Sequence, residues 1–210
     1  MRGLNPLTGE ELWRFTGLEN PLISTPTTNF GYCFCFTGKE FVAIRLGGRG
    51  DVTQSHKVWA VPLEAQFISP LYVTGMLFVV TDQGNLICFD WRDGKRIHEQ
   101  QLSKNSASYA APLLSANRIY FPLESEGVVV CEATSKASLV SQNQIEDDSN
   151  PVRASLAVSG NRLFLRNEKF VYCLANSKKA PRKIARTSFK NNSELIVPEL
   201  INQELSYPKN

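Results

Sequence analysis

Residues 43–59, AIRLGGRGDVTQSHKVW, contain two strings that are typical of binding sites. Gly47-Gly48-Arg49-Gly50 has the composition of a phosphate-binding loop, and Arg49-Gly50-Asp51 is the tripeptide that cell-adhesion receptors bind. A phosphate loop leads into a helix N-terminus, whose backbone N–H groups bind the anion. The residues that follow here, up to Trp59, are instead strand-like. We therefore interpret the segment as a turn in which glycine allows positive φ angles.

The five cysteines and two histidines are the residues best able to hold a metal ion or act as nucleophiles. Cys33 and Cys35 lie in an alternating segment, which places both on one face of a strand. A zinc site needs Cys-x-x-Cys pairs on turns, so we expect buried free thiols that pack as small hydrophobic groups. His56 and His98 belong to different repeats of the chain. No catalytic residue and no metal ligand is predicted from them.

Composition favours a globular β protein. Hydrophobic residues make up 42% and charged residues 20% of the chain, with ample Phe, Tyr, Val and Ile and with Gly and Pro as breaks. No run approaches the ~20 apolar residues of a transmembrane helix, and no signal peptide is visible. From Asn176 onward the chain has seven basic and three acidic residues, which leaves residues 1–175 nearly neutral. No nucleic-acid partner is predicted.

The chain repeats itself. Two sets of residues keep one spacing of 42 to 45 residues: Pro26, Pro70, Pro112 and Leu156, and Ala43, Cys88, Cys131 and Cys173. Each unit reads as short alternating apolar runs separated by Asp, Asn and Gly turns, which are hairpin signals. Four strands in about 40–45 residues are typical of the blade of a β-propeller. The predicted fold is therefore all-β, with four-stranded antiparallel blades.

The turns between the third and fourth strands carry a family resemblance. The segment LNPLTGEELW has Asn5, Thr8, Gly9 and Trp13 at the places of an Ala/Cys-x-Asp-x-x-Thr-Gly-x-x-x-Trp motif, and CFDWRDGKRIH has Cys88, Asp90 and Gly94, with His98 in place of Trp. These units resemble the pyrroloquinoline-quinone-like (PQQ-like) propeller repeat, especially that of uncharacterised planctomycete-type bacterial proteins. The resemblance implies that Trp13 and Trp59 pack between adjacent blades.

The predicted organisation has units near residues 22–64, 66–104, 108–146 and 151–175, and a separate outer strand at 10–16. Residues 176–210 are expected to form a polar, basic, disordered tail. Because the chain opens on a fourth strand and its repeats end after a third, we expect a partial ring, such as the C-terminal half of a larger propeller. Further blades of that propeller would then be among its partners.

The resemblance leaves three functions open. The first is a non-catalytic platform that binds a protein or a small molecule. The second is part of a PQQ-dependent oxidoreductase, although PQQ enters from the family name only and no carboxylate matches the calcium site of those enzymes. The third is an outer-membrane assembly-type propeller. We favour the first, and the family implies a periplasmic or extracellular location.

A ligand would be expected at the loops that lead into the innermost strands, because propellers hold functional groups on rigidly positioned loops. In this repeat those loops carry Thr25, Ser69, Tyr109 and Arg153. Arg153 is the leading candidate, since a lone cation among neutral groups would hold an anionic ligand. The alternative is that Arg153 forms an ion pair with Asp147 or Asp148.

Overall fold

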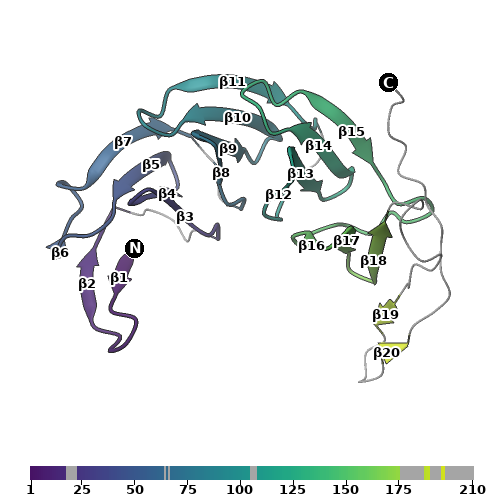
Figure 1. The fold of residues 1–210 in the computed structure, drawn as a ribbon, viewed down its shortest axis with the longest axis horizontal. Coiled ribbons are helices and arrows are strands. Elements are labelled where there is room, and N and C mark those ends of the chain that lie inside the picture. Colours follow the sequence, from purple (N-terminus) through teal and green to yellow (C-terminus); the bar gives the residue numbers. More distant parts are fainter. Residues whose placement is uncertain are drawn as a thin grey trace. The chain divides into compact units, whose positions relative to one another are not determined.

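The computed structural model describes residues 1–17, 23–63, 65, 67–104, 108–175, 187–189 and 195–196, and these residues form strands and turns without a helix. The chain divides into two compact units, Met1–Leu102 and Ser103–Asn210. Each unit is built mainly from antiparallel sheets whose strands follow one another along the chain (Figure 1). The predicted all-β fold with four-stranded blades is confirmed.

Unit 1 contains two complete blades and one smaller sheet. The first blade consists of β3 (Thr27–Asn29), β4 (Tyr32–Phe36), β5 (Glu40–Arg45) and β7 (Lys57–Pro62). The second consists of β8 (Leu71–Val73), β9 (Met76–Val80), β10 (Asn85–Asp90) and β11 (Arg96–Gln101). The smaller sheet is formed by β1 (Arg2–Leu4), β2 (Glu11–Arg14) and β6 (Gly50–Asp51).

Unit 2 contains the third and fourth blades. The third consists of β12 (Leu113–Ser115), β13 (Arg118–Leu123), β14 (Gly127–Glu132) and β15 (Leu139–Asn143). The fourth consists of β16 (Ala157–Ser159), β17 (Arg162–Arg166), β18 (Phe170–Ala175), β19 (Thr187–Phe189) and β20 (Leu195–Ile196). Strands β19 and β20 continue the sheet from β18. The disordered tail expected for residues 176–210 stays a prediction. The rest of residues 176–210 lies outside the described residues.

The repeat seen in the sequence has a structural counterpart in the pairing of third and fourth strands. Ala43 lies opposite Trp59, Cys88 opposite His98, and Cys131 opposite Leu139. In all three blades the register shifts next to this third-strand residue, as at a β-bulge. Trp59, His98 and Leu139 are therefore one position of the repeat, which we call the docking position.

The Asx turn before the fourth strand also recurs. In the N-terminal hairpin, Asn5 Oδ1 accepts the backbone N–H of Leu7 at 2.9 Å, and the N–H of Gly9 donates to the Asn5 carbonyl at 2.8 Å. The same two bonds join Asp90 to Arg92 and Gly94, at 2.9 and 3.0 Å. Strands β1 and β2 are thus the third and fourth strands of a blade, and the predicted outer strand at 10–16 is observed at 11–14.

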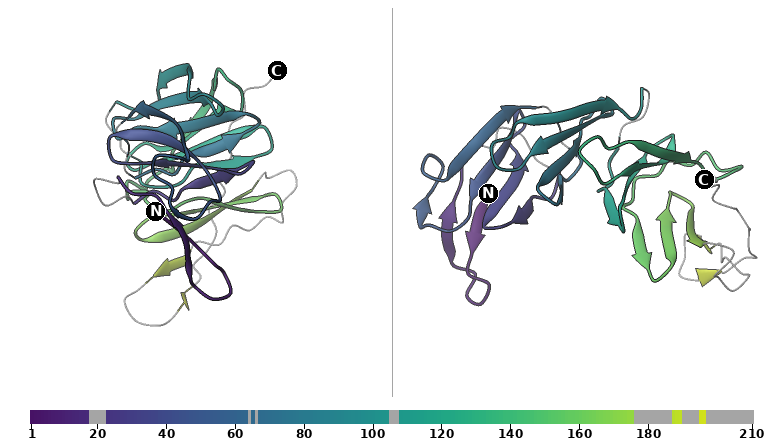
Figure 2. Two further views of the ribbon diagram at one scale, coloured as in Figure 1. Left: turned by 90° about the vertical axis from the view of Figure 1, so that its left-hand side faces the viewer. Right: turned by 45° about the horizontal axis from the view of Figure 1, so that its top comes forward.

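The glycine-rich segment forms more than the predicted turn. Gly50 and Asp51 form β6, which pairs in parallel with Trp13 and Arg14 of β2. The backbone N–H of Val52 then donates to the Arg14 carbonyl at 2.9 Å. The segment adds a third strand to the edge of the N-terminal hairpin, where backbone groups of β2 would otherwise be unpaired. Figure 2 shows this hairpin, in purple, from two further directions.

Strand β4 is apolar at every position because sheets cover both of its faces. Phe34 and Phe36 belong to a buried cluster shared with the second blade. Cys33 and Cys35 point to the other face and join a cluster with Phe15 of the N-terminal segment. The side-chain period of two in a strand separates the two sets. The prediction that Cys33 and Cys35 share one face and are buried is confirmed.

All five cysteines are free thiols. Cys88 and Cys131 are fully buried in third strands, and burial raises the pKa of each thiol to about 11. Cys173 is only half-buried, which corrects the expectation that all three equivalent cysteines are buried. The reason is that β17, its neighbour, has only Leu165 buried, so this part of the fourth blade is less covered.

Trp59 joins the first blade to the second by a hydrogen bond and by packing. Its indole Nε1–H donates to the Trp91 carbonyl at 2.9 Å, and its ring packs edge-on against Phe41. Gly94 lies directly under the ring, since a Cβ atom built there would be 2.8 Å from Trp59. The expected packing of Trp59 between adjacent blades is confirmed.

Replacing Gly94 with Ala should destabilise unit 1 more than replacing Gly9 with Ala. Both glycines have positive φ, +70° and +74°, but a Cβ at Gly9 meets nothing within 4 Å. Gly9→Ala should therefore cost about 1–2 kcal/mol, the cost of a left-handed residue. Gly94→Ala should cost about 1–3 kcal/mol more, because the Trp59 ring must move. Urea unfolding measures the difference, and equal losses would contradict the docking role of Trp59.

Candidate functional site

Two of the four predicted ligand-binding residues contact each other. The backbone N–H of Thr25 donates to Ser69 Oγ at 2.9 Å. In unit 2 the N–H of Ala111 donates to Ser155 Oγ at 3.0 Å, and both pairs are separated by 44 residues. A serine before the innermost strand thus bonds the preceding blade. The prediction missed Ser155, although its position directly before Leu156 matches that of Ser69 before Pro70.

The other two predicted residues, Tyr109 and Arg153, also lie together. The guanidinium Cζ of Arg153 is 6.0 Å from the centre of the Tyr109 ring. Its nitrogens form ion pairs with Glu124 at 2.6 Å and Glu168 at 2.8 Å. The hydrogen bond and charge of Glu124 raise the pKa of Arg153. The partners are these two glutamates rather than Asp147 or Asp148, so Arg153 is not the lone cation that the anion-binding hypothesis assumed.

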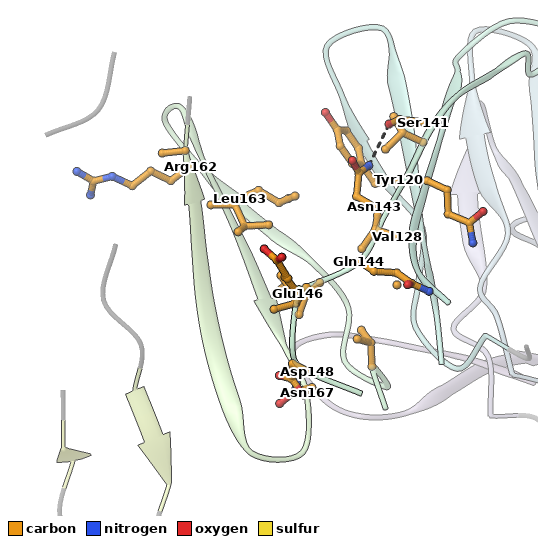
Figure 3. A pocket seen from close by; sticks show the side chains of 18 of the residues that line it. Tyr120, Val128, Ser141, Asn143, Gln144, Glu146, Asp148, Arg162, Leu163 and Asn167 are labelled. Carbon is orange, nitrogen blue, oxygen red and sulfur yellow. Dashed lines mark hydrogen bonds between the residues drawn. The ribbon is translucent and has the colours of Figure 1, made fainter. Parts of the chain in front are cut away.

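A groove runs between the third and fourth blades of unit 2, with a volume of about 1400 Å³. Its apolar surface comes from both blades and includes Tyr120, Val128, Val130, Leu163, Leu165 and Leu174. Its polar surface comes mainly from β15 and the segment after it, and includes Ser141, Asn143, Gln144, Glu146, Asp148 and Asn150. Figure 3 shows Leu163 facing the strands of the third blade, with Asp148 beside Asn167 at one end. We call this feature the blade 3–4 groove.

The residues at two repeated positions differ between the first and the third blade. Trp59 occupies the docking position between the first two blades, whereas the third blade has Leu139 there, which is 62% exposed. In unit 1 the turn before β4 carries Phe30, which packs against Trp91 with ring centres 5.7 Å apart. The equivalent turn residue of the third blade is Ala116, which also has a positive φ. The third blade therefore has smaller side chains than the first blade at both positions.

Asp148 fixes the polar end of the groove. Its Oδ2 accepts hydrogen bonds from Asn167 Nδ2 at 2.6 Å and from the Tyr172 hydroxyl, and its Oδ1 accepts the backbone N–H of Asn150 at 2.9 Å. Partial burial opposes ionisation of Asp148, but these hydrogen bonds outweigh it and lower its pKa. The carboxylate therefore holds the segment after β15 against β17 and β18 of the fourth blade. Sequence reasoning considered Asp148 only as a partner of Arg153.

The histidines occupy separate environments. His56 Nδ1 lies 2.9 Å from Ser55 Oγ, and the His56 ring packs against Gly48 of the glycine-rich segment. His98 Nε2 is buried and has no hydrogen-bond partner in the part of the chain that the structure describes. Among the same residues, no three His, Cys, Asp or Glu side chains are gathered so that they could hold a metal ion. No helix there is long and apolar enough to cross a bilayer.

The blades and their repeated turns define a β-propeller fold, and comparison with known proteins gives the family. The sequence profile described as "Outer membrane protein assembly factor BamB", a PQQ-like repeat profile, matches residues 1–199. The chain therefore belongs to the PQQ-like β-propeller family. A search of curated protein sequences finds no significant match.

Solved structures with a similar fold include three of different kinds. BamB from Moraxella catarrhalis is 12% identical, with a TM-score of 0.68 over 93% of this chain and 63% of that one. The computationally designed Ika4 protein is 11% identical, with a TM-score of 0.63 over 80% of this chain and 99% of that one. Quinohemoprotein alcohol dehydrogenase from Comamonas testosteroni is 12% identical, with a TM-score of 0.56 over 82% of this chain and 34% of that one. The chain thus spans less than two thirds of BamB.

Replacing Asp148 with Asn should destabilise unit 2 by about 2 kcal/mol, because hydrogen bonds to a charged group are lost and an amide N–H₂ would face other donors. Asp147→Asn is the matched control, since Asp147 has a positive φ that Asn tolerates.

The lowered pKa of Asp148 also predicts a pH dependence. The stability that Asp148 contributes is present above its unfolded-state pKa and is lost as pH falls through its folded-state pKa. The advantage of the wild type over Asp148→Asn should thus begin to fall below about pH 4 and decrease further as the pH is lowered. Chemical unfolding at neutral and acidic pH measures both effects, and an unchanged advantage in acid would contradict this role.

Proposed function

We propose that this chain is a non-catalytic propeller module that binds another protein, and that the blade 3–4 groove receives a segment of that partner. The supporting observation is the size and lining of the groove. Its volume of about 1400 Å³ exceeds the roughly 300–1,000 Å³ of small-molecule pockets. A groove of this size suits a stretch of polypeptide better than a single compact cofactor.

The lining suits a polypeptide as well. Valine and leucine side chains of both blades would bury apolar side chains of the partner, and the amide of Gln144 would hydrogen-bond its backbone. Strand β15 is the last strand of its sheet, so its outer edge offers further backbone groups for pairing. The polar groups at the predicted ligand position, in contrast, are already engaged with one another.

The family description and the likeness to BamB support a role in assembly as one form of this function. The likeness to quinohemoprotein alcohol dehydrogenase supports the alternative, in which the chain is part of a PQQ-dependent oxidoreductase. Membership of the family also agrees with a periplasmic or extracellular location, which remains part of this proposal. The alternatives differ in whether PQQ or a protein is bound.

Site-specific photo-crosslinking in the native cell tests the protein-binding proposal. A photoreactive residue at Gln144, which is exposed and lines the groove, should give a discrete adduct with a protein partner. The same residue at Lys136 is the control, because Lys136 is exposed on the same blade but does not line the groove. Equal labelling from both positions, or none from Gln144, would count against the groove as the binding site.

Titration with PQQ and Ca²⁺ tests the oxidoreductase alternative. We expect the absorbance spectrum of PQQ to be unchanged by the protein, because the proposed function needs no cofactor. An apo-quinoprotein dehydrogenase serves as the positive control. Saturable binding of PQQ, with electron transfer to a dye in the presence of an alcohol, would favour the enzyme over the platform.

A further inference from the structure

Four aromatic side chains of unit 1 gather around Trp91, which lies in the turn after β10. The centre of its ring is 5.5 Å from that of Tyr32 and 6.5 Å from that of Tyr72, and both tyrosine rings are edge-on to it. The ring centre of Phe30 is 5.7 Å away. These are the distances of rings in contact, so a ligand would bind to their outer surfaces rather than between them. We call these four residues the aromatic cluster.

Phe30 is the exposed member of the aromatic cluster and has an unusual backbone. Its side chain is 69% exposed and its φ is +47°. It is the first residue of a two-residue hairpin turn, and the same place in the other three blades is taken by residues that also have positive φ but no aromatic ring: Thr74, Ala116 and Gly160. A left-handed backbone destabilises a residue other than glycine, and an exposed ring recovers little of this by burial. Such an outlier points to a function at the surface.

The polar groups of the aromatic cluster are available as hydrogen-bond donors. In the part of the chain that the structure describes, the Tyr32 hydroxyl and the Trp91 indole N–H form no hydrogen bond, and neither is buried. The Arg92 guanidinium, 5.8 Å from the Trp91 ring centre, adds further N–H groups. The adjacent carboxylate of Asp90 is already engaged, since it accepts the backbone N–H of Arg92 at 2.9 Å and pairs with the Arg92 guanidinium at 3.6 Å.

We propose that the aromatic cluster binds a proline-rich segment of a partner protein in the polyproline II conformation. Such a segment packs its pyrrolidine rings on aromatic faces, presents carbonyl acceptors to donors, and is ordered before it binds. A partner strand could not pair with β4, which carries Tyr32, because β3 and β5 occupy both of its edges. A carbohydrate would need acceptors for its hydroxyl groups, and the Asp90 carboxylate is engaged. The proposal concerns unit 1 and does not rest on the blade 3–4 groove.

NMR of the whole chain, labelled with ¹⁵N, tests the site through its indole signals. The chain has three tryptophans, Trp13, Trp59 and Trp91, and the Trp59 indole already donates to a backbone carbonyl. Titration with a decaproline peptide should move the Trp91 indole signal most, and saturably, whereas a Gly-Ser peptide of equal length should move none. No saturable shift with decaproline, or a largest shift at another tryptophan, would overturn the proposal. A saturable shift with cellohexaose but not with decaproline would assign the rings to carbohydrate and equally overturn it.

Two variants, each with a matched control, separate binding from folding. Phe30→Gly should weaken decaproline binding by about tenfold or more, the usual effect of truncating an aromatic anchor. The turn accepts glycine there, since Gly160 stands at the same place in the fourth blade. Ala116→Gly makes the same change at the equivalent turn of the third blade and should bind like the wild type. Unchanged affinity in Phe30→Gly, or an equal loss in both variants, would contradict the proposed site.

Trp91→Phe keeps an aromatic ring but removes the indole N–H. Its affinity for decaproline should fall by about 2- to 10-fold, the effect of one hydrogen bond. Trp13→Phe is the control, because Trp13 packs in the N-terminal sheet outside the aromatic cluster, and it should bind like the wild type. Wild-type affinity in Trp91→Phe would show that the indole N–H is not a donor to the ligand and would overturn the donor-based choice of a proline-rich segment.

Discussion

The contact on which the structure of unit 1 depends is the burial of one blade face against the next. Strand β4 shows the constraint most clearly, because Phe34 and Phe36 face the second blade while Cys33 and Cys35 face the N-terminal sheet. A strand covered on both faces cannot alternate apolar and polar residues, so every position must be apolar. Trp59 then fixes how the two blades meet, by one hydrogen bond and by close packing over Gly94.

The docking position shows how one repeat can produce different surfaces. Trp59 fills the space between the first two blades, whereas Leu139 in the third blade leaves its side chain largely exposed. The hydrogen bond from a backbone N–H to the serine before the innermost strand is present in both units. Blade contact near the innermost strands is therefore kept where the docking residue changes.

Two polar residues of unit 2 join segments that are distant in sequence. Asp148 holds the segment after β15 against the fourth blade, and Arg153 joins Glu124 to Glu168. A fold shared by assembly factors, designed proteins and dehydrogenases does not itself assign a function. Function must come from what each chain places on the shared blades, and the blade 3–4 groove is one such feature here.

The sequence by itself determined the features that local patterns encode. The period, the strand runs, the turns at Asn5 and Asp90, and the equivalence of Trp59 with His98 could all be predicted, because they depend on residues a few positions apart or one repeat apart. For the same reason Thr25 was grouped with Ser69, and Tyr109 with Arg153. Only the tertiary structure decided what meets across longer separations without a repeated spacing: β6 against β2, Met1 beside Cys33, and Glu124 with Arg153. Such contacts depend on how sheets pack and where loops return, and side-chain types alone do not encode either.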